Sequence, residues 1–443
     1  MGVDVRIEGG TILEVGAGLV RRTGEPEVNA RGGAVIPGLH DHHVHLRAWA
    51  AARTSVDLST VRSPDDLDRR LRTAATDAPA GTWLRGVGWH ESTGGNLDRH
   101  RLDALTARHP VRIQHRTGAL WVLNSAALTV TGAATAPVPG IERDASDEPT
   151  GRLWRADDWL RAHTVPTHDP FPDALTALAA EAAAQGVTRW TDATPGRAQS
   201  ETDALATLWS AALPGLVLMS PSGTALPGFD TNVRLGPQKI VLDDATLPTA
   251  GELAATIRAS HAAGSPVAVH CVTAEQLVTL VAALDEAGAA LGDRVEHAGI
   301  VPPGYAARLA ALGLALVTNP GFLADRGDRY RQEVEERDWL YPVRSLLDAG
   351  VTVAAATDAP FGPADPWVAI AAAVDRRTAS GHVLAPDERV PPSTALALFH
   401  TDPDAPGRAR RIAPGHPSDV VLLHTPLATA LASPSAQHVR ATF

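Results

Sequence analysis

Residues 34–45 read AVIPGLHDHHVH, a short apolar run that ends in closely spaced histidines. Side chains alternate along a β-strand with a period of two, so His43 and His45 are expected to project to the same side. Two imidazoles on one side of a strand can act as a pair of metal ligands. A histidine-rich surface turn is the competing interpretation, because the run also contains His40 and His42. The rest of the chain decides between the two.

Seven further apolar runs also end in polar or metal-binding residues, and most are separated by alanine- and leucine-rich segments with helical spacing. The eight runs cover residues 34–45, 187–194, 216–220, 238–244, 267–272, 294–299, 314–320 and 352–360. Alternating strands and helices of this number predict an α/β fold, a (β/α)₈ TIM barrel. The active site of such a barrel lies at the carboxyl ends of its strands.

Three segments do not fit the repeating unit of strand and helix. About 140 residues separate the first two runs, far more than an ordinary connection, so residues from about 50 to about 170 are expected to form an inserted subdomain or lid. Residues 1–36 and 402–443 alternate like short strands, and we expect them to form one small β-sandwich. The metal-dependent barrel domain is therefore predicted over residues 37–401.

Composition limits the classes of partner. The chain has 443 residues, 44% of them hydrophobic, and a formal net charge of −11. An acidic chain without a long basic cluster is not expected to bind nucleic acid or an anionic membrane, so a small molecule is the expected substrate. Cys271 is the only cysteine, which excludes a disulfide-built scaffold. The first residues lack an export signal and no apolar stretch has the length of a membrane helix, so a soluble cytoplasmic protein is expected.

The basic residues are 38 arginines and one lysine, Lys239, which lies in the strand-like segment GPQKIVLDD. Burial lowers the pKa of a lysine, and a neutral amine can do covalent chemistry that arginine cannot. It can form a Schiff base with a carbonyl compound, or take up carbon dioxide to become a carbamate that bridges two metal ions. The competing interpretation is an arginine-biased genome in which one lysine survived by chance.

Other predicted strands also end in groups that can bind metals. His270 and His297 each end an apolar run, and Asp358 ends the eighth. A single histidine of this kind is more often a structural residue than a ligand. Several strand ends that offer imidazole, amine or carboxylate groups to one barrel mouth are much harder to assign to chance. Imidazole together with carboxylate oxygen suits zinc or another borderline divalent ion.

These features together resemble the amidohydrolase superfamily of metal-dependent hydrolases. The similarity is carried, in the family's order, by PGLHDHHVHL (37–46), the strand lysine, His270, EHAGI (296–300) and TDAP (357–360). The segments GVGWHES, RTGALWVLNSAAL, GRLW, GVTRWTDA and VAVHCVT are similar to the branch called YtcJ-like or amidohydrolase family 3, which includes N-substituted formamide deformylases. The resemblance spans essentially the whole chain.

The resemblance implies a binuclear metal centre, with two divalent ions expected to be Zn²⁺. His43 and His45 would hold one ion, His270 and His297 the other, and carbamylated Lys239 would bridge them. Asp358 would be both a ligand and the proton shuttle, which makes Asp358, Lys239 and His297 the expected catalytic residues. The resemblance also implies a homodimer.

The implied reaction is hydrolysis of a carbon–nitrogen bond in a small amide, formamide, carbamate or cyclic amide by a metal-activated hydroxide. A deaminase or an ester or lactone hydrolase on the same scaffold is the nearest alternative, because an activated hydroxide attacks any suitably polarised centre. A Schiff-base lyase that uses Lys239 is a weaker alternative. A metal-free barrel retained as an assembly module is the alternative from a different class.

The sequence also offers candidate substrate contacts. They are Trp89, His90, Glu91, Arg116, Trp121 and Asn124 in the predicted insertion, with Asp325 and Arg329 after the seventh run. The two tryptophans have packing of the insertion core as their competing role, and Arg116 either clamps a carboxylate or is solvated. His90 and Ala119 depart from residues common in the branch, so no substrate is transferred from a relative.

Overall fold

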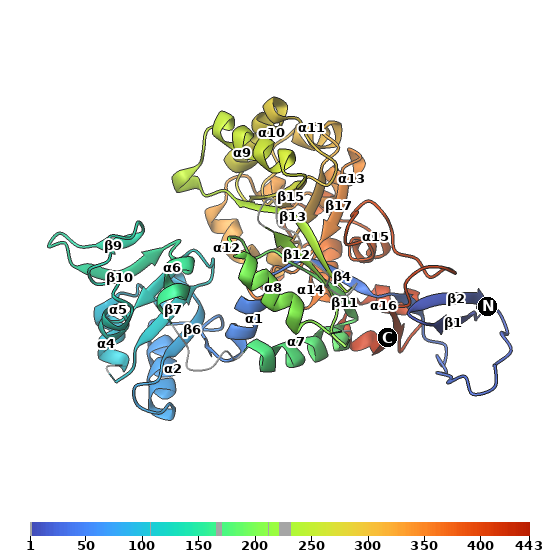
Figure 1. The fold of residues 1–443 in the computed structure, drawn as a ribbon, viewed down its shortest axis with the longest axis horizontal. Coiled ribbons are helices and arrows are strands. Elements are labelled where there is room, and N and C mark those ends of the chain that lie inside the picture. Colours follow the sequence, from blue (N-terminus) through green and yellow to red (C-terminus); the bar gives the residue numbers. More distant parts are fainter. Residues whose placement is uncertain (1, 107, 165–170, 211, 221–231) are drawn as a thin grey trace. The chain divides into compact units, whose positions relative to one another are not determined.

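The computed structural model of the protein describes residues 2–106, 108–164, 171–210, 212–220 and 232–443 (Figure 1). These residues form two compact units. One consists of residues 1–46 together with residues 176–443, and the other of residues 47–175. Each unit is built around its own sheet and is described separately.

The first unit contains a sheet of eight parallel strands that follow one another in chain order. The strands are β4 (Leu39–Val44), β11 (Val187–Asp192), β12 (Gly215–Ser220), β13 (Val233–Val241), β14 (Val267–Cys271), β15 (Arg294–His297), β16 (Ala315–Thr318) and β17 (Thr352–Ala355). Just past β17, the Asp358 N–H donates to the His43 carbonyl over 2.9 Å, and the His45 N–H donates to the Ala359 carbonyl over 2.8 Å. These bonds join the last strand to the first, and the predicted (β/α)₈ barrel is confirmed.

Two strand boundaries differ from the sequence prediction. The run at residues 34–45 divides at Gly38 into β3 (Val35–Pro37), which belongs to another sheet, and the barrel strand β4. A Cβ atom at Gly38 would lie 2.2 Å from Thr188 Oγ1, so only glycine fits where the chain passes between the two sheets. The strand β13 begins at Val233 instead of residue 238, because its first residues pair with β12.

Helices surround the barrel (Figure 1). They are α7 (Phe171–Gln185), α8 (Gln199–Leu208), α9 (Ala250–Ala262), α10 (Ala274–Ala287), α11 (Tyr305–Ala311), α12 (Gly321–Glu333), α13 (Val343–Asp348), α14 (Pro366–Asp375), α15 (Pro392–Ala397) and α16 (Leu427–Ala432), with 3₁₀ turns at Asp244–Thr246, Arg337–Trp339, Pro386–Glu388 and Ala436–His438. A capping box of Thr249 and Glu252 starts α9. Within the described ranges, the helices are all too short or too polar to cross a bilayer.

Strands from both ends of the chain lie together in the same unit. The N-terminal residues form the antiparallel pair β1 (Asp4–Glu8) and β2 (Thr11–Gly16), and β3 pairs with β18 (Val420–Leu423), which pairs with β19 (Val439–Thr442). The Ile12 N–H donates to the His416 carbonyl over 2.8 Å and so joins the N-terminal pair to the C-terminal segment. The expected association of the two chain ends in extra β-structure is confirmed.

The second unit, residues 47–175, has a six-stranded mixed sheet. Its strand order is β5 (Val56–Asp57), β6 (Leu84–Trp89), β7 (Val111–His115), β8 (Leu120–Leu123), β10 (Pro149–Trp154) and β9 (Ile141–Arg143). Its helices are α2 (Pro64–Asp77), α3 (Glu91–Gly94), α4 (Arg99–Thr106), α5 (Ser125–Thr131) and α6 (Asp157–His163), and α1 (Leu46–Arg53) leads into it. The helix α2 packs Leu67 and Leu71 into a core that contains Trp89.

A buried ion pair supports the start of the barrel. Asp192, at the end of β11, accepts a 2.6 Å hydrogen bond from Arg197 Nη2, and both side chains are at most 3% exposed. The other carboxylate oxygen of Asp192 accepts from the Leu46 N–H over 3.3 Å, directly after His45. The pair therefore helps to hold the chain where it leaves β4.

We expect Arg197→Met to lower the free energy of unfolding by about 3–5 kcal/mol, because it leaves the Asp192 carboxylate buried without its cation. Urea unfolding followed by circular dichroism measures this change. Arg308→Met is the matched control, since the Arg308–Asp285 pair is about half exposed and its loss should leave the unfolding midpoint almost unchanged. Equal midpoints for the two variants would contradict the stabilising role of Arg197.

Candidate metal centre

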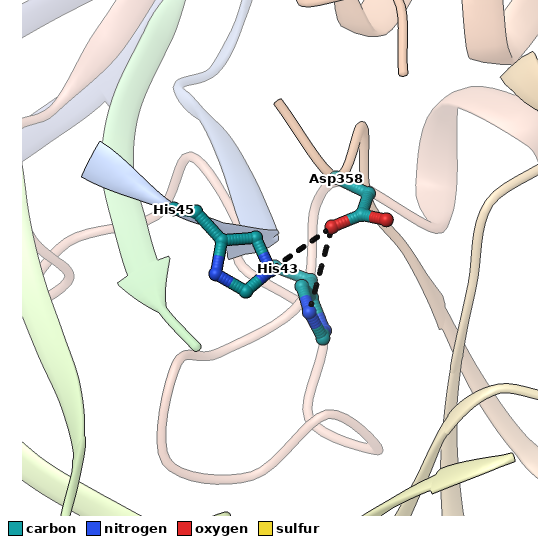
Figure 2. Close-up of side chains that lie close together, drawn as sticks. All are labelled: His43, His45 and Asp358. Carbon is teal, nitrogen blue, oxygen red and sulfur yellow. Dashed lines mark ion pairs between the residues drawn. The ribbon is translucent and has the colours of Figure 1, made fainter. Parts of the chain in front are cut away.

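Two histidines and an aspartate converge where β4 and β17 end. His43 is completely buried, and its Nε2 atom lies 3.7 Å from Asp358 Oδ1. His45 Nε2 lies 3.2 Å from the same oxygen, and Figure 2 shows both imidazoles turned toward the carboxylate. The three donor atoms lie within 4.8 Å of one another. The structure thus brings together three side chains that the sequence analysis proposed as metal ligands.

The other three predicted ligands extend the same cluster. Lys239 projects from β13 and places its Nζ atom 3.4 Å from His43 Nε2. His297, on β15, has its ring centroid 4.7 Å from that of His43 and 4.6 Å from that of His270, on β14. All six residues therefore gather at the carboxyl ends of the barrel strands, where active sites of this fold occur.

The surroundings favour a neutral amine at Lys239. Desolvation by burial lowers the pKa of Lys239 to about 8, although the negative charges of Glu296 and Asp358 act in the opposite direction. Desolvation also lowers the pKa of His43 and of His297, so both rings are neutral near physiological pH. Neutral imidazole and neutral amine are the forms that offer lone pairs to a metal ion or to carbon dioxide.

Asp358 carries the negative charge of the cluster. Burial opposes its ionisation, but the contact with His45 and the neighbouring His297 and His43 rings bring the pKa of Asp358 below its usual range. Its Oδ1 atom is buried and makes no hydrogen bond of acceptable geometry with any described residue. This ionised oxygen faces the Nε2 atoms of His43 and His45.

Glu296 orients His43, and the sequence analysis did not assign it this role. Glu296 Oε2 contacts His43 Nδ1 very closely, and both side chains are fully buried. Arg294 Nε donates to the other oxygen of Glu296 over 2.5 Å. Because the carboxylate accepts the proton on Nδ1, the lone pair of His43 lies on Nε2, which faces Lys239 and Asp358. The signal in the sequence was the carboxylate next to His297 in EHAGI, but its partner is far away along the chain.

Asn319 plays the corresponding part for His297. The Asn319 amide oxygen lies 2.8 Å from His297 Nδ1, and the Asn319 amide nitrogen donates to the Ala356 carbonyl over 3.1 Å. The second bond fixes which end of the amide faces the imidazole, so Nδ1 is the donor and Nε2 carries the lone pair. No motif in the sequence indicated this contact.

The backbone is strained at the residues of the cluster. His297 has φ = 70°, Ala298 has φ = 44° and Asp358 has φ = 60°, all in the left-handed region that non-glycine residues seldom adopt. Such conformations persist where the surrounding structure enforces them, and they are frequent at functional sites. Here they turn the ends of β15 and β17 so that His297 and Asp358 face the cluster.

The donor set fits divalent metal ions. Four imidazoles, one ionised carboxylate and an amine with a lowered pKa gather in one cluster. Nitrogen and oxygen donors of this kind suit zinc and similar borderline ions. The buried Asp358 oxygen gives the fit a physical reason, because a cation between it and the two imidazoles would bind all three groups.

Six of the predicted substrate contacts belong to the unit formed by residues 47–175, and three of them make structural contacts there. Trp89 is completely buried, and its indole N–H donates to the Gly95 carbonyl over 3.1 Å. Trp121 donates to Asp157 over 2.8 Å and packs in the second core of the unit. Asn124 is fully buried, accepts from two backbone N–H groups and donates to the His109 carbonyl. These contacts give all three side chains structural roles.

The other predicted contacts lie near the ends of β6 and β7 or in α12. His90 and Glu91 are next to each other at the end of β6, and the Arg116 N–H donates to the Trp89 carbonyl over 2.8 Å. In α12, Asp325 pairs with its neighbour Arg326 over 3.2 Å, and Arg329 Nε lies 3.2 Å from Glu333 Oε2. A substrate contact by any of these residues stays a prediction.

Comparison with known proteins is consistent with this site. The chain is 30% identical over 470 residues to the N-substituted formamide deformylase of Arthrobacter pascens. The alignment covers 90% of this chain and 85% of that protein. It is 27% identical to the YtcJ protein of Bacillus subtilis (strain 168), with 89% of this chain and 85% of that protein covered.

The fold is also found in a crystal structure, that of an uncharacterized metal-dependent hydrolase from Pyrococcus horikoshii OT3. It matches with a TM-score of 0.73 at 21% identity and covers 94% of this chain and 92% of the other. The sequence profile of the amidohydrolase family matches residues 26–442, nearly the whole chain. The protein is therefore a member of the amidohydrolase family.

Proposed function

We propose that this amidohydrolase-family enzyme hydrolyses the carbon–nitrogen bond of a small amide, formamide, carbamate or cyclic amide. The observation that carries the proposal is the convergence of His43, His45 and the ionised Asp358, with the Lys239 amine 3.4 Å from His43. The name of the Arthrobacter pascens relative supports the class of bond, since a deformylase removes a formyl group from nitrogen.

We infer a pair of divalent ions as the cofactor, most simply Zn²⁺. His43 and His45 would hold one ion, His270 and His297 the other, and Asp358 would contribute a carboxylate oxygen. Lys239 would bridge the two ions as a carbamate, formed when its neutral amine attacks carbon dioxide and loses a proton. A pKa lowered to about 8 supports this reaction, because it leaves an appreciable fraction of neutral amine near physiological pH. When bound, the ions would polarise a substrate carbonyl and lower the pKa of water.

Asp358 suits the transfer of a proton. The carboxylate is ionised and lies beside the ligand nitrogens of His43 and His45, so it could accept a proton from the attacking water. It would then deliver that proton to the leaving nitrogen, while a carbon–oxygen bond forms and the carbon–nitrogen bond breaks. An amide or formamide gives a carboxylic acid and a free amine. A cyclic amide opens to a single amino acid, and a carbamate gives an amine, carbon dioxide and an alcohol. Burial of His43 and His297 would exclude competing water from the ligand nitrogens.

Product analysis tests the reaction class. Zinc-loaded enzyme is expected to release one amine and one acid in equal amounts from an N-substituted formamide or a related small amide, measured by chromatography of both products. An N-substituted substrate separates amide hydrolysis from deamination, because only deamination would liberate ammonia from it. Turnover of esters or lactones without turnover of any amide, formamide, carbamate or cyclic amide would contradict the proposal.

Lys239→Arg should lose bound metal, and its turnover should fall at least about 100-fold. The reason is that arginine keeps the positive charge but cannot form a carbamate. Elemental analysis and the hydrolysis assay measure the two effects. Lys239→Ala is the companion variant, and short carboxylic acids should restore part of its turnover by supplying a bridging carboxylate. Full activity of Lys239→Arg would show that no bridging carbamate is needed.

Glu296→Gln should weaken metal binding by about 10–100-fold, because the neutral amide holds His43 in its ligand tautomer less strongly than the carboxylate does. Competition with a chromophoric chelator measures the affinity without any activity assay. Glu252→Gln is a matched control, since Glu252 only caps α9. An unchanged metal affinity in Glu296→Gln would contradict the orienting role of Glu296.

A further inference from the structure

A second group of potential ligands lies in the unit formed by residues 47–175. The strands β6 and β7 are parallel neighbours, and Trp89, the last residue of β6, pairs in register with His115, the last residue of β7. His90 follows Trp89 directly, so the carboxyl ends of the two strands bring His90 and His115 together. Their ring centroids are 5.0 Å apart. Glu91 is the first residue of the short helix α3 and joins the two imidazoles there.

The three side chains present donor atoms to one another. His115 Nε2 lies 3.0 Å from Glu91 Oε2, and one donor atom from each of the three residues lies within 4.8 Å of the others. Each histidine is only 8% exposed, whereas the Glu91 side chain is 48% exposed. The imidazoles are therefore held in place by their surroundings, and the carboxylate is free to rotate into a better position.

Both imidazoles are oriented in the same way by a hydroxyl two residues further along the chain. His90 Nδ1 lies 2.7 Å from Ser92 Oγ, and His115 Nδ1 lies 2.8 Å from Thr117 Oγ1. With the Nδ1 atoms engaged in this way, the His115 ring is turned so that its Nε2 atom faces Glu91 Oε2. Metal-binding histidines characteristically carry such a partner on their second ring nitrogen, because it fixes the ring and its tautomer.

A proton rearrangement accompanies binding of a cation. In the structure the Nδ1 atoms also accept from the backbone N–H groups of Ser92, at 3.1 Å, and Thr117, at 3.3 Å, which places the ring proton on Nε2. A cation on Nε2 would displace that proton. Nδ1 would then carry the ring proton and donate it to the hydroxyl oxygen, at the expense of the backbone hydrogen bond.

We propose that His90, Glu91 and His115 bind one divalent ion of the zinc class, with none of the ligands of the barrel centre. Two imidazoles and one carboxylate match the ligand preference of such an ion and leave further positions for water. Tetrahedral zinc with nitrogen ligands at 2.0–2.1 Å needs donors about 3.4 Å apart, so only a small closure is required and the exposed Glu91 side chain can supply it. This role differs from the direct substrate contact predicted for His90 and Glu91.

The electrostatics of Glu91 agree with a cation site. Burial opposes its ionisation, but its own backbone N–H and the two imidazoles lower the pKa of Glu91 overall. The carboxylate is therefore ionised near physiological pH and gives the site an anionic ligand. A bound ion would tie the ends of β6 and β7 to α3.

Counting bound ions in the full-length protein tests the proposal. Wild type and His115→Gln are loaded with Co²⁺, dialysed, and examined by elemental analysis and visible absorption. Wild type should retain one more ion per chain than His115→Gln, and the same difference should persist when His43 and His45 are both replaced by alanine to remove the clamp of the barrel centre. His100→Gln is the matched control, because His100 is an exposed histidine of the same unit outside the cluster.

Milder variants keep the test decisive if His115→Gln fails to fold. Ser92→Ala should weaken Co²⁺ binding at this site by about 10-fold, because it removes the partner of His90 Nδ1. Glu91→Gln should weaken it further. Equal cobalt content in wild type, Glu91→Gln and folded His115→Gln would overturn the proposal. Failure of the hydrolytic function would instead appear as missing turnover with cobalt retention at this site unchanged.

Discussion

The metal centre depends on the seam where the last strand of the barrel meets the first. Asp41, inside β4, accepts hydrogen bonds from the Thr357 hydroxyl over 2.5 Å and the Thr357 N–H over 3.0 Å. Burial of this carboxyl group inside the seam raises the pKa of Asp41 to about 7. Backbone hydrogen bonds beside it join His43 to Asp358. Because these bonds close the barrel, two segments from opposite ends of the sequence meet at one point.

Burial and neighbouring charges shift the pKa values of the groups at the centre in different ways. Burial lowers the pKa of the His43 imidazole, which makes that ring a neutral donor, and it lowers the pKa of Lys239 enough that part of the amine is neutral near physiological pH. Neighbouring positive or polar groups keep Asp358 and Glu296 ionised in the same interior. Neutral nitrogen donors and fixed anions side by side are what a bound dication requires. The outer partners Glu296 and Asn319 then hold His43 and His297 so that their lone pairs face inward.

The same geometric rule operates in both units. Parallel neighbouring strands end at the same edge of a sheet, so residues at their carboxyl ends lie close together whatever their separation in the sequence. In the barrel this rule gathers six potential ligands. In the unit formed by residues 47–175 it brings His90 to His115 across β6 and β7, whereas Trp89, one residue earlier, is committed to the core.

The sequence by itself determined the eight barrel strands, the association of the chain ends and the six side chains at the rim, because local periodicity and short motifs report strands and the residues that end them. It did not reveal the partners Glu296 and Asn319, the division of the first run at Gly38, or the structural hydrogen bonds of Asn124. Those features depend on neighbours that only the folded chain supplies. Glu296, for example, reaches His43 across 253 residues of sequence, and no local pattern records such a contact.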